Sequence, residues 1–351
     1  GEFKNNIPHG KGIKYYSNGN PLYEGYFING KYEGNGKYFY NNGNIFIGQY
    51  KNGLIHGKGI EYYSNGKIMY EGEYINDQKE GKGKYIWEDG QYYIGHYKNG
   101  LRNGKGKEFY SNGKIKYYGD FINDKYEGNG KYFWNNGEYY IGQWKNGLMH
   151  GKGTKYYSNG KIMYEGDYIN DKREGIGKYY YDDGEYYIGE FKNGLVNGKG
   201  ILYYKNGKIK YEGDFINDKY EGKGKYIYED GDYYIGQFKN GSINREGVKY
   251  YKTGNIRYKG GWNNGLRHGK GALYYKNGNV RYIGDWINDK ADGEGRYIFE
   301  SGDYYIGQFK NFSMNGEGVE YYKTGTIKYI GEWINNKYEG KGKFYFKNGD
   351  S

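Results

Sequence analysis

An aromatic-x-Gly-x-aromatic motif recurs along the whole chain of 351 residues. In fourteen copies the third residue is Gly and both outer positions are aromatic, as in Tyr140/Gly142/Trp144. The copies begin at residues 23, 46, 70, 93, 117, 140, 164, 187, 211, 234, 258, 282, 305 and 329. Gly1-Glu2-Phe3 continues the series as a truncated first unit, 1–22. A fixed period of this length is typical of repeat architectures, so we predict one continuous repeat array over residues 1–351.

The spacing between copies alternates between 23 and 24 residues, so the true period is a pair of 47 residues. The extra residue of the long unit falls between its second strand and the next motif, for example in residues 64–69 before Tyr70. Side chains alternate between the two faces of a strand. One added residue would therefore invert the next strand unless a bulge or a longer turn absorbs it. We expect the turn of the long unit to absorb it.

Each unit is predicted to form two short strands. Residues 233–238 alternate in the manner of a strand and lead into an Asn-Gly pair at 240–241. Asn-Gly and Asp-Gly between β-forming residues favour tight hairpin turns. Within the strand, Tyr234, Gly236 and Phe238 share one face. The aromatic rings are therefore expected to lie over glycines of the strand pair and cover their backbone.

These hairpins predict an all-β fold. We expect an elongated, single-layer antiparallel sheet of about 15 tandem β-hairpin repeats, forming a twisted, solenoid-like ribbon without helices. At roughly 4.8 Å per strand, about 30 strands would make a ribbon about 140 Å long. The composition agrees, because 67 Gly and 54 Tyr stand beside a hydrophobic content of only 36%, which leaves little for a thick aliphatic core.

The residues offer no candidate for catalysis, and we predict neither an enzyme nor a bound cofactor or metal. The absence of Cys removes thiolate chemistry and fits an intracellular protein. A phosphate-loop-like segment at 147–154 has no following helix to supply an N-terminus. Acidic pairs recur before turn glycines, where turn chemistry explains them. Four histidines share one slot in units too far apart to converge on a metal ion: His9, His56, His150 and His268.

The net charge of +11, from 53 basic and 42 acidic residues, permits attraction to acidic partners. A row of lysines repeats with the 47-residue period on one loop edge: Lys51, Lys98, Lys145, Lys192 and Lys239. At a spacing of about 19 Å, this row could lie on an anionic surface. The alternative is a solvated edge that discourages edge-to-edge aggregation. No apolar run is long enough for a transmembrane helix.

The pattern breaks in the C-terminal half. Two long units follow one another, starting at Tyr234 and Tyr258. Arg245 replaces the first Gly of a Gly-x-Gly pair, and Phe312 replaces the Gly of a Lys-Asn-Gly turn. If that Gly has a positive φ, Phe312 must force a different loop. We interpret Arg245, Trp262 and Phe312 as a candidate partner patch, with neutral drift at tolerant turns as the alternative.

The repeat resembles the MORN repeat (membrane occupation and recognition nexus). Tyr211-Glu212-Gly213, Gly222-Lys223-Gly224 and Gly231 follow its order of Tyr-x-Gly, then Gly-x-Gly, then a turn Gly. The resemblance covers the entire chain. Long units, such as residues 156–166, also resemble a related variant of the repeat found in bacterial proteins. The resemblance implies an elongated single-layer antiparallel sheet.

Members of this family are mostly scaffolds in cilia and flagella, at cytoskeletal rings and at membrane junctions. The resemblance therefore implies a non-catalytic structural scaffold that assembles proteins in a cilium, a flagellar axoneme or another cytoskeletal structure. An intracellular location follows from the same reasoning. The abundance of Asn, Lys, Tyr and Ile is typical of an AT-rich genome, such as that of a ciliate or an apicomplexan, and adds modest support, although some bacteria have such genomes too.

Three alternatives remain open. The chain could be an anionic-lipid (phosphoinositide) adaptor at the membrane periphery that uses the lysine row. It could be the regulatory arm of a larger enzyme, and residue 1 being Gly rather than Met is compatible with a trimmed chain. Nucleic-acid binding is disfavoured because the tyrosines are needed for the sheet and 42 acidic residues are interspersed. A homodimer is allowed, since some family members associate as elongated dimers.

Overall fold

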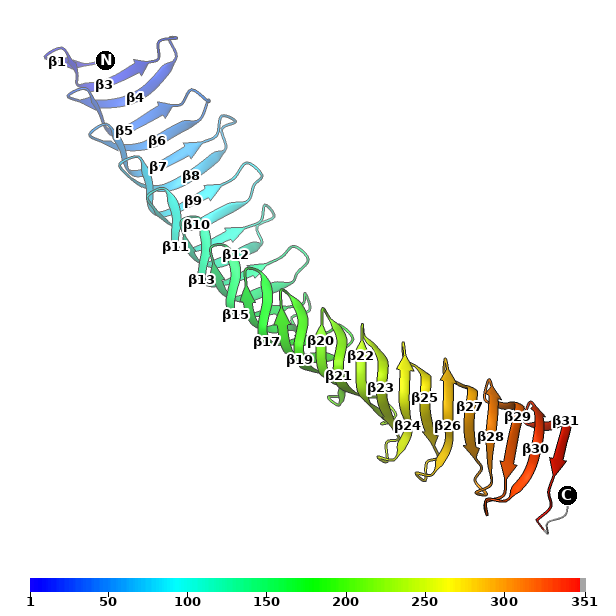
Figure 1. Ribbon diagram of the computed structural model, residues 1–351. Helices are drawn as coiled ribbons and strands as arrows, with labels where there is room; N and C mark the ends of the chain where they lie inside the picture. The colour runs from blue at the N-terminus through cyan, green and yellow to red at the C-terminus, as the bar shows by residue number, and fades with distance from the viewer. Residues whose placement is uncertain (348–351) are drawn as a thin grey trace. The chain divides into compact units, whose positions relative to one another are not determined.

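The computed structural model describes residues 1–347, which form only strands, turns and bends. The chain divides into two compact units, Gly1–Arg173 and Glu174–Ser351. In Figure 1 the strands of each unit follow one another in the order of their labels. Because residues 1–347 contain no helix, they contain no apolar helix long enough to cross a membrane.

The strands of the first unit are β1 (Phe3–Lys4), β2 (Ile7–Pro8), β3 (Gly10–Tyr15), β4 (Pro21–Ile28), β5 (Lys31–Phe39), β6 (Ile45–Lys51), β7 (Leu54–Tyr62), β8 (Ile68–Ile75), β9 (Gln78–Ile86), β10 (Tyr92–Lys98), β11 (Leu101–Phe109), β12 (Ile115–Ile122), β13 (Lys125–Phe133), β14 (Tyr139–Lys145), β15 (Leu148–Tyr156) and β16 (Ile162–Ile169).

The strands of the second unit are β17 (Lys172–Tyr180), whose first two residues belong to the first unit, β18 (Tyr186–Lys192), β19 (Leu195–Tyr203), β20 (Ile209–Ile216), β21 (Lys219–Ile227), β22 (Tyr233–Lys239), β23 (Ser242–Tyr250), β24 (Ile256–Asn263), β25 (Leu266–Tyr274), β26 (Val280–Ile287), β27 (Lys290–Ile298), β28 (Tyr304–Lys310), β29 (Ser313–Tyr321), β30 (Ile327–Ile334) and β31 (Lys337–Phe344).

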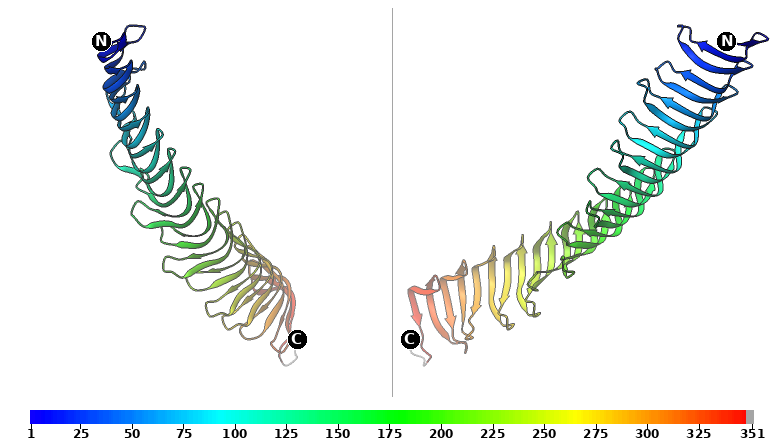
Figure 2. Two further views of the ribbon diagram at one scale, coloured as in Figure 1. Left: turned by 90° about the vertical axis from the view of Figure 1, so that its left-hand side faces the viewer. Right: turned by 180° about the vertical axis from the view of Figure 1, so that it is seen from behind.

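Each unit is an open ladder of hairpins. From β3 to β16, and again from β17 to β31, every strand pairs antiparallel with the next strand of the chain, as in β10–β11 and β30–β31. Over the described residues, no pairing joins the first strand of a ladder to its last. The views in Figure 2 show a single layer of strands in each unit, with no helix on either face of the described chain. The predicted all-β antiparallel hairpin array is confirmed.

One face of each sheet, which we call the aromatic face, carries the motif rings over a row of paired glycines. Gly25 pairs with Gly36, and a Cβ added to either glycine would collide with the ring or hydroxyl of Tyr23. The Tyr23 side chain is fully buried, and its hydroxyl donates to the Tyr26 carbonyl at 3.2 Å. The glycines are therefore required because they leave room for the ring, as the sequence predicts.

The buried rings pack against one another edge to face. The Tyr140 ring lies 5.3 Å from that of Trp144, with an angle of 87° between the planes, and 5.2 Å from that of Tyr168. Edge-to-face geometry is favourable because the positive ring edge meets the negative ring face. A sheet without a second layer thus obtains its core from aromatic side chains on one face.

The two unit types have the same turn at the sheet edge opposite the Lys-Asn-Gly turns. In a short unit the Trp87 amide donates to the Gln91 carbonyl at 2.9 Å, and in a long unit the Tyr110 amide donates to the Lys114 carbonyl at the same distance. Both turns have the same number of residues. The expectation that a longer turn absorbs the extra residue was therefore wrong.

A β-bulge absorbs the extra residue directly after that turn. Along β11 and β12, Glu108 pairs with Tyr117 and Phe109 pairs with Ile115, which leaves Lys116 as an inserted residue. The bulge restores the alternation, so Tyr117 still faces the glycines. It also brings Lys116, which we call the bulge residue of its unit, within reach of Glu108 on the aromatic face.

Phe312 keeps the turn that Gly forms elsewhere, so the prediction of a different loop was wrong. Asn311 and Phe312 have φ values of 52° and 73°, close to the 51° and 83° of Asn99 and Gly100. The Phe312 amide donates to the Ala291 carbonyl at 2.8 Å. A left-handed non-glycine residue costs about 1–2 kcal/mol. The Phe312 ring offsets this strain by packing edge-on against a tryptophan, at 5.2 Å.

Candidate interaction surfaces

The side of the sheet opposite the aromatic face, which we call the exposed face, carries a mixed row of aliphatic and basic side chains. In the first unit, cross-strand pairs connect Ile94 to Lys107, Lys107 to Tyr118, Tyr118 to Lys131 and Lys131 to Ile141. The fractional exposures of Ile94, Tyr118 and Ile141 are 45%, 41% and 42%. These five residues surround a shallow hollow of about 770 Å³.

The second unit repeats this row on its own exposed face. Ile235 pairs with Val248, and Ile306 pairs with Val319, which in turn pairs with Ile330. Ile235, Ile306 and Ile330 are each more than 40% exposed. A hollow of about 510 Å³ lies around Ile235 and Val248. Aliphatic side chains are thus held in register at the surface of both units.

Stacked aromatic pairs lie beside this row on the exposed face. The rings of Tyr139 and Tyr156 are 4.4 Å apart and nearly parallel, and those of Tyr186 and Tyr203 are 4.5 Å apart. The Lys131 ammonium lies 4.2 Å from the centre of the Tyr139 ring. Aromatic, aliphatic and cationic groups therefore occur together on this face.

The predicted lysine row lies where the sequence places it, at the exposed strand ends before the Asn-Gly turns. Each lysine has a carboxylate close by. The amide of Asn99, which follows Lys98, donates to Glu80 Oε2 at 2.9 Å, and that of Asn146 donates to Glu127 Oε2 at 2.8 Å. The same bond follows the other three lysines. These carboxylates weaken the positive potential of the row.

The residues of the predicted partner patch do not all meet. Trp262 and Phe312 line one cavity of the second unit. Arg245 lies outside that lining, with a φ of 61° and its Nη1 3.5 Å from Gln237 Oε1. The corresponding residue of the first unit, Gly104, has a φ of 83°, so Arg245 has a positive φ at a position where Gly also has one.

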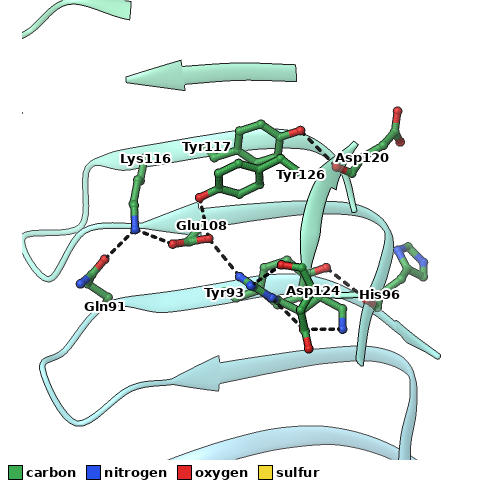
Figure 3. A network of polar contacts seen from close by, with 10 residues as sticks. Gln91, Tyr93, His96, Glu108, Lys116, Tyr117, Asp120, Asp124 and Tyr126 are labelled. Atoms are coloured by element: carbon green, nitrogen blue, oxygen red, sulfur yellow. Dashed lines mark hydrogen bonds and ion pairs between the residues drawn. The ribbon is translucent and has the colours of Figure 1, made fainter. Parts of the chain in front are cut away.

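A buried polar network on the aromatic face is absent from the sequence predictions. Glu108 is only 6% exposed and accepts three hydrogen bonds: from Lys116 Nζ at 2.7 Å, Arg102 Nη1 at 3.0 Å and the Tyr126 hydroxyl at 3.0 Å. Figure 3 shows Lys116 and Tyr126 converging on Glu108. Burial and the neighbouring Glu108 carboxylate raise the pKa of Tyr126. A glutamate eight residues before a basic bulge residue is the sequence signal for this network.

The same arrangement recurs near the end of the second unit. Glu320 is 6% exposed, accepts from Lys328 Nζ at 2.8 Å and contacts the Tyr338 hydroxyl. Lys328 is again the bulge residue, eight positions later. We call the position of Glu108 and Glu320 the carboxylate slot. A carboxylate buried in it is tolerable because a cation and a tyrosine hydroxyl bind its oxygens.

A cavity of about 780 Å³ opens on the aromatic face of the second unit, where the slot holds Lys249 instead. Arg257, Arg267 and Arg281 also line it. Arg257 pairs with Asp232 at 2.7 Å and Arg267 pairs with Asp289 at 2.9 Å. Burial and, secondarily, the charge of Arg257 lower the pKa of Lys249.

The MORN repeat model matches nearly the whole chain. The matched residues are 1–20, 23–45, 46–68, 70–92, 93–115, 117–139, 140–162, 164–186, 187–209, 211–233, 234–256, 258–280, 282–304 and 329–351. The chain belongs to the MORN repeat family. Thirteen of these matches begin at the unit boundaries predicted from the aromatic motif after the truncated first unit. A MORN repeat variant matches residues 314–335, a long-unit segment other than 156–166.

The other comparisons carry no argument about function. No curated protein is similar enough in sequence to be a relative. A crystal structure of a protein of unknown function from Bacteroides caccae shares 12% identity with this MORN repeat chain, covering 77% of it and 88% of its own length, with a TM-score of 0.15. Membership of the MORN repeat family, a family of repeat scaffolds, is thus what the comparisons establish.

The histidines of this MORN array lie apart from one another. In the part of the chain that the structure describes, no group of three His, Cys, Asp or Glu side chains is placed to hold a metal ion. His96, on a strand of the first unit, has its Nδ1 3.1 Å from the Lys105 carbonyl.

Proposed function

We propose that this MORN repeat array is a non-catalytic scaffold that binds proteins along the exposed faces of its sheets. The observation that carries this proposal is the row of half-exposed isoleucines held in register, such as Ile94 and Ile141. A solvated sheet face normally carries polar side chains, and a repeated apolar surface marks an interaction site. Flanking lysines keep the surface soluble and orient acidic partners.

A cytoskeletal structure, such as a cilium or flagellar axoneme, is the intracellular setting in which we place this scaffold. Long assemblies offer many identical sites, and a repeat array with matching spacing binds them with high avidity. Within the first unit, Ile94 and Ile141 are four strands apart, a distance of about 19 Å. A homodimer and a regulatory arm of a larger enzyme are compatible extensions of the same binding role.

An adaptor for anionic lipid is the second candidate, favoured by one further observation at the loop edge. Exposed aliphatic side chains accompany the lysine row there, with Leu101 40% and Ile122 51% exposed. Lysines beside aliphatic groups are typical of interfacial membrane contacts. Against this candidate, Glu80 and Glu127 lie at the same turns as Lys98 and Lys145 and reduce the attraction to anionic headgroups.

Fractionation of the source cells tests the scaffold with matched variants. Ile94→Glu with Ile141→Glu alters the exposed face of β10 and β14, and Lys98→Gln with Lys145→Gln alters the loop edge of the same strands by the same charge. We expect the wild type and the loop-edge variant to remain in the pellet after mild detergent and moderate salt. The exposed-face variant is expected in the supernatant, because two buried charges would disrupt the apolar contact.

The other outcomes of this fractionation are equally decisive. Release of the wild type by detergent alone, together with weakened membrane association of the loop-edge variant, would support the lipid adaptor. A wild-type chain that is soluble before detergent is added would contradict both candidates. Circular dichroism of the purified variants shows whether each keeps its β-structure.

A further inference from the structure

Lys249 occupies the carboxylate slot of its repeat, where Glu108 and Glu320 stand in other repeats, and it is followed eight residues later by a basic bulge residue, as they are. Lys249, Arg257 and Arg267 stand in the second unit where Glu108, Lys116 and Tyr126 stand in the first, each 141 residues later. In the first unit the bulge residue Lys116 neutralises Glu108 at 2.7 Å. In the second unit the bulge residue Arg257 pairs with Asp232, and its charge acts on Lys249, which is itself a cation.

Within residues 1–347, a further cation of the cavity also forms no ion pair, at the place where two long units follow one another. Arg281 is the next bulge residue, and the slot of its own unit holds Leu273. Asp232 is the last residue of the turn before β22, two strands ahead of the strand of Arg257, and it accepts a hydrogen bond from that arginine. The corresponding turn, two strands ahead of the strand of Arg281, ends at Asn255, whose side-chain amide donates to a backbone carbonyl. Within residues 1–347, Arg281 Nε donates to the Tyr297 hydroxyl at 3.4 Å, and the guanidinium lies over the rings of Tyr275 and Tyr297.

The charges of the cavity consequently do not balance. Of its four cations, Arg257 and Arg267 have carboxylate partners, whereas Lys249 and Arg281 form no ion pair within residues 1–347. The Lys249 ammonium lies 4.3 Å from the centre of the Tyr228 ring. Lys249 is partly buried, so screening by water is reduced around its charge and it attracts an anion, while the exposed Arg281 adds to the positive potential of the cavity.

The lining suits an anionic side chain carried on a peptide. Aromatic rings, including Tyr251, Trp262 and Phe312, form much of the wall. The volume of about 780 Å³ exceeds what a single carboxylate needs and admits its side chain and neighbouring residues. Glu108 and Glu320 show that a glutamate fits the slot when a cation and a hydroxyl group bind it.

We propose that this cavity binds a glutamate or aspartate side chain from an acidic segment of a partner protein, which supplies the carboxylate that the first unit supplies from its own chain. Lys249 binds the carboxylate, Arg281 adds positive charge from the same lining, and the aromatic wall contacts the adjoining residues. This inference deepens the proposed scaffold function and rests on it for the class of partner. It adds a specific acidic anchor to the apolar contacts of the exposed face.

Titration of the full chain with an acetylated hexaglutamate amide, followed by calorimetry and tryptophan fluorescence, tests this site. Lys249→Glu fills the slot from within and pairs with Arg257 and Arg267. We therefore expect it to weaken peptide binding by about tenfold or more while preserving or raising thermal stability. Lys239→Glu makes the same change of charge on the loop edge of the same unit and should leave the affinity within about twofold of the wild type.

Three results would overturn the proposal. Equal losses in Lys249→Glu and Lys239→Glu would mean that the peptide follows net charge alone. Binding of inorganic phosphate that displaces the peptide and is tighter than hexaglutamate would assign the cavity to a phosphoryl group. No binding of the peptide would refute the acidic anchor. The fractionation of the exposed-face variant is independent of this cavity, so the scaffold function would stand or fall separately.

Discussion

At the scale of single residues, the aromatic ring and its glycines are one structural device. The Tyr140 ring covers Gly142 and Gly153, and a Cβ on either glycine would collide with that ring. The same ring packs edge-on against Trp144. Each motif ring therefore shields backbone that side chains cannot shield and also contributes to the core.

Alkali is expected to unfold the protein by ionising these rings. Burial raises the pKa of Tyr23, Tyr93 and Tyr305 from 10.0 to about 12. The folded chain thus favours the neutral phenol, whose contribution to stability is complete below pH 10 and is lost as the pH rises to about 12. We expect the urea midpoint to fall steeply over that interval. A midpoint that stays constant up to pH 12 would contradict the burial of the rings.

At the scale of strands and bulges, the described residues with a positive φ that are not Gly, Asn or Asp both lie in the second unit. Arg245 in β23 has a positive φ where other repeats have Gly, and Phe312 before β29 has a positive φ where other repeats have Gly, Asp or Asn. Strained residues persist where the surrounding structure enforces them, and they gather at functional sites. Phe312 lines the cationic cavity, and Arg245 pairs in register with Trp262, which also lines it.

Arg245→Gly is expected to stabilise the chain by about 1 kcal/mol, because it relieves a left-handed conformation without removing a buried contact. Gly104→Arg is the reciprocal change in the first unit and should destabilise by a similar amount, since Gly104 has a φ of 83°. Urea denaturation of both variants measures the difference. If Arg245→Gly instead lowered the free energy of unfolding, the contacts of the arginine side chain would contribute more stability than its backbone strain removes.

The hairpin array could be predicted from the sequence because its cause is local. Gly at the centre of each motif and turn pairs such as Asn-Gly, Asp-Gly and Asn-Asp leave few alternatives to rings packed over a hairpin. The bulge could not be predicted, because a bulge and a longer turn both absorb one residue and leave the same spacing. Lys116 was consequently not expected to reach Glu108.

The cavity was only partly foreseeable. Phe312 and Trp262 stand out in the sequence, but the missing counter-charge of Lys249 becomes visible only when its slot is superimposed on that of Glu108. The prediction for Phe312 was wrong because it assumed that the turn would change its backbone conformation, whereas Phe312 adopts the positive φ of the turn. The Phe312 ring packs against Trp286, and this contact stabilises the left-handed conformation in an unchanged turn.

At the scale of the whole molecule, repetition itself is the basis of the proposed function. Each unit presents the same kind of row, with Ile94 and Ile141 in the first and Ile235 and Ile306 in the second. Weak contacts repeated along one chain give high avidity without any single strong site. The lysine row remains a prediction as an anionic-surface contact, and its nearby carboxylates favour protein over lipid as the principal partner.

The most direct measurement of the central claim is site-specific photo-cross-linking in the source cells. A benzoylphenylalanine would replace Ile94 or Ile141 on the exposed face and, as the matched control, Lys98 or Lys145 on the loop edge of the same strands. The account predicts that both exposed-face positions cross-link to the same protein partner and that the loop-edge positions yield much less of that product. Cross-linking confined to the loop edge, or equal at all four positions, would contradict it.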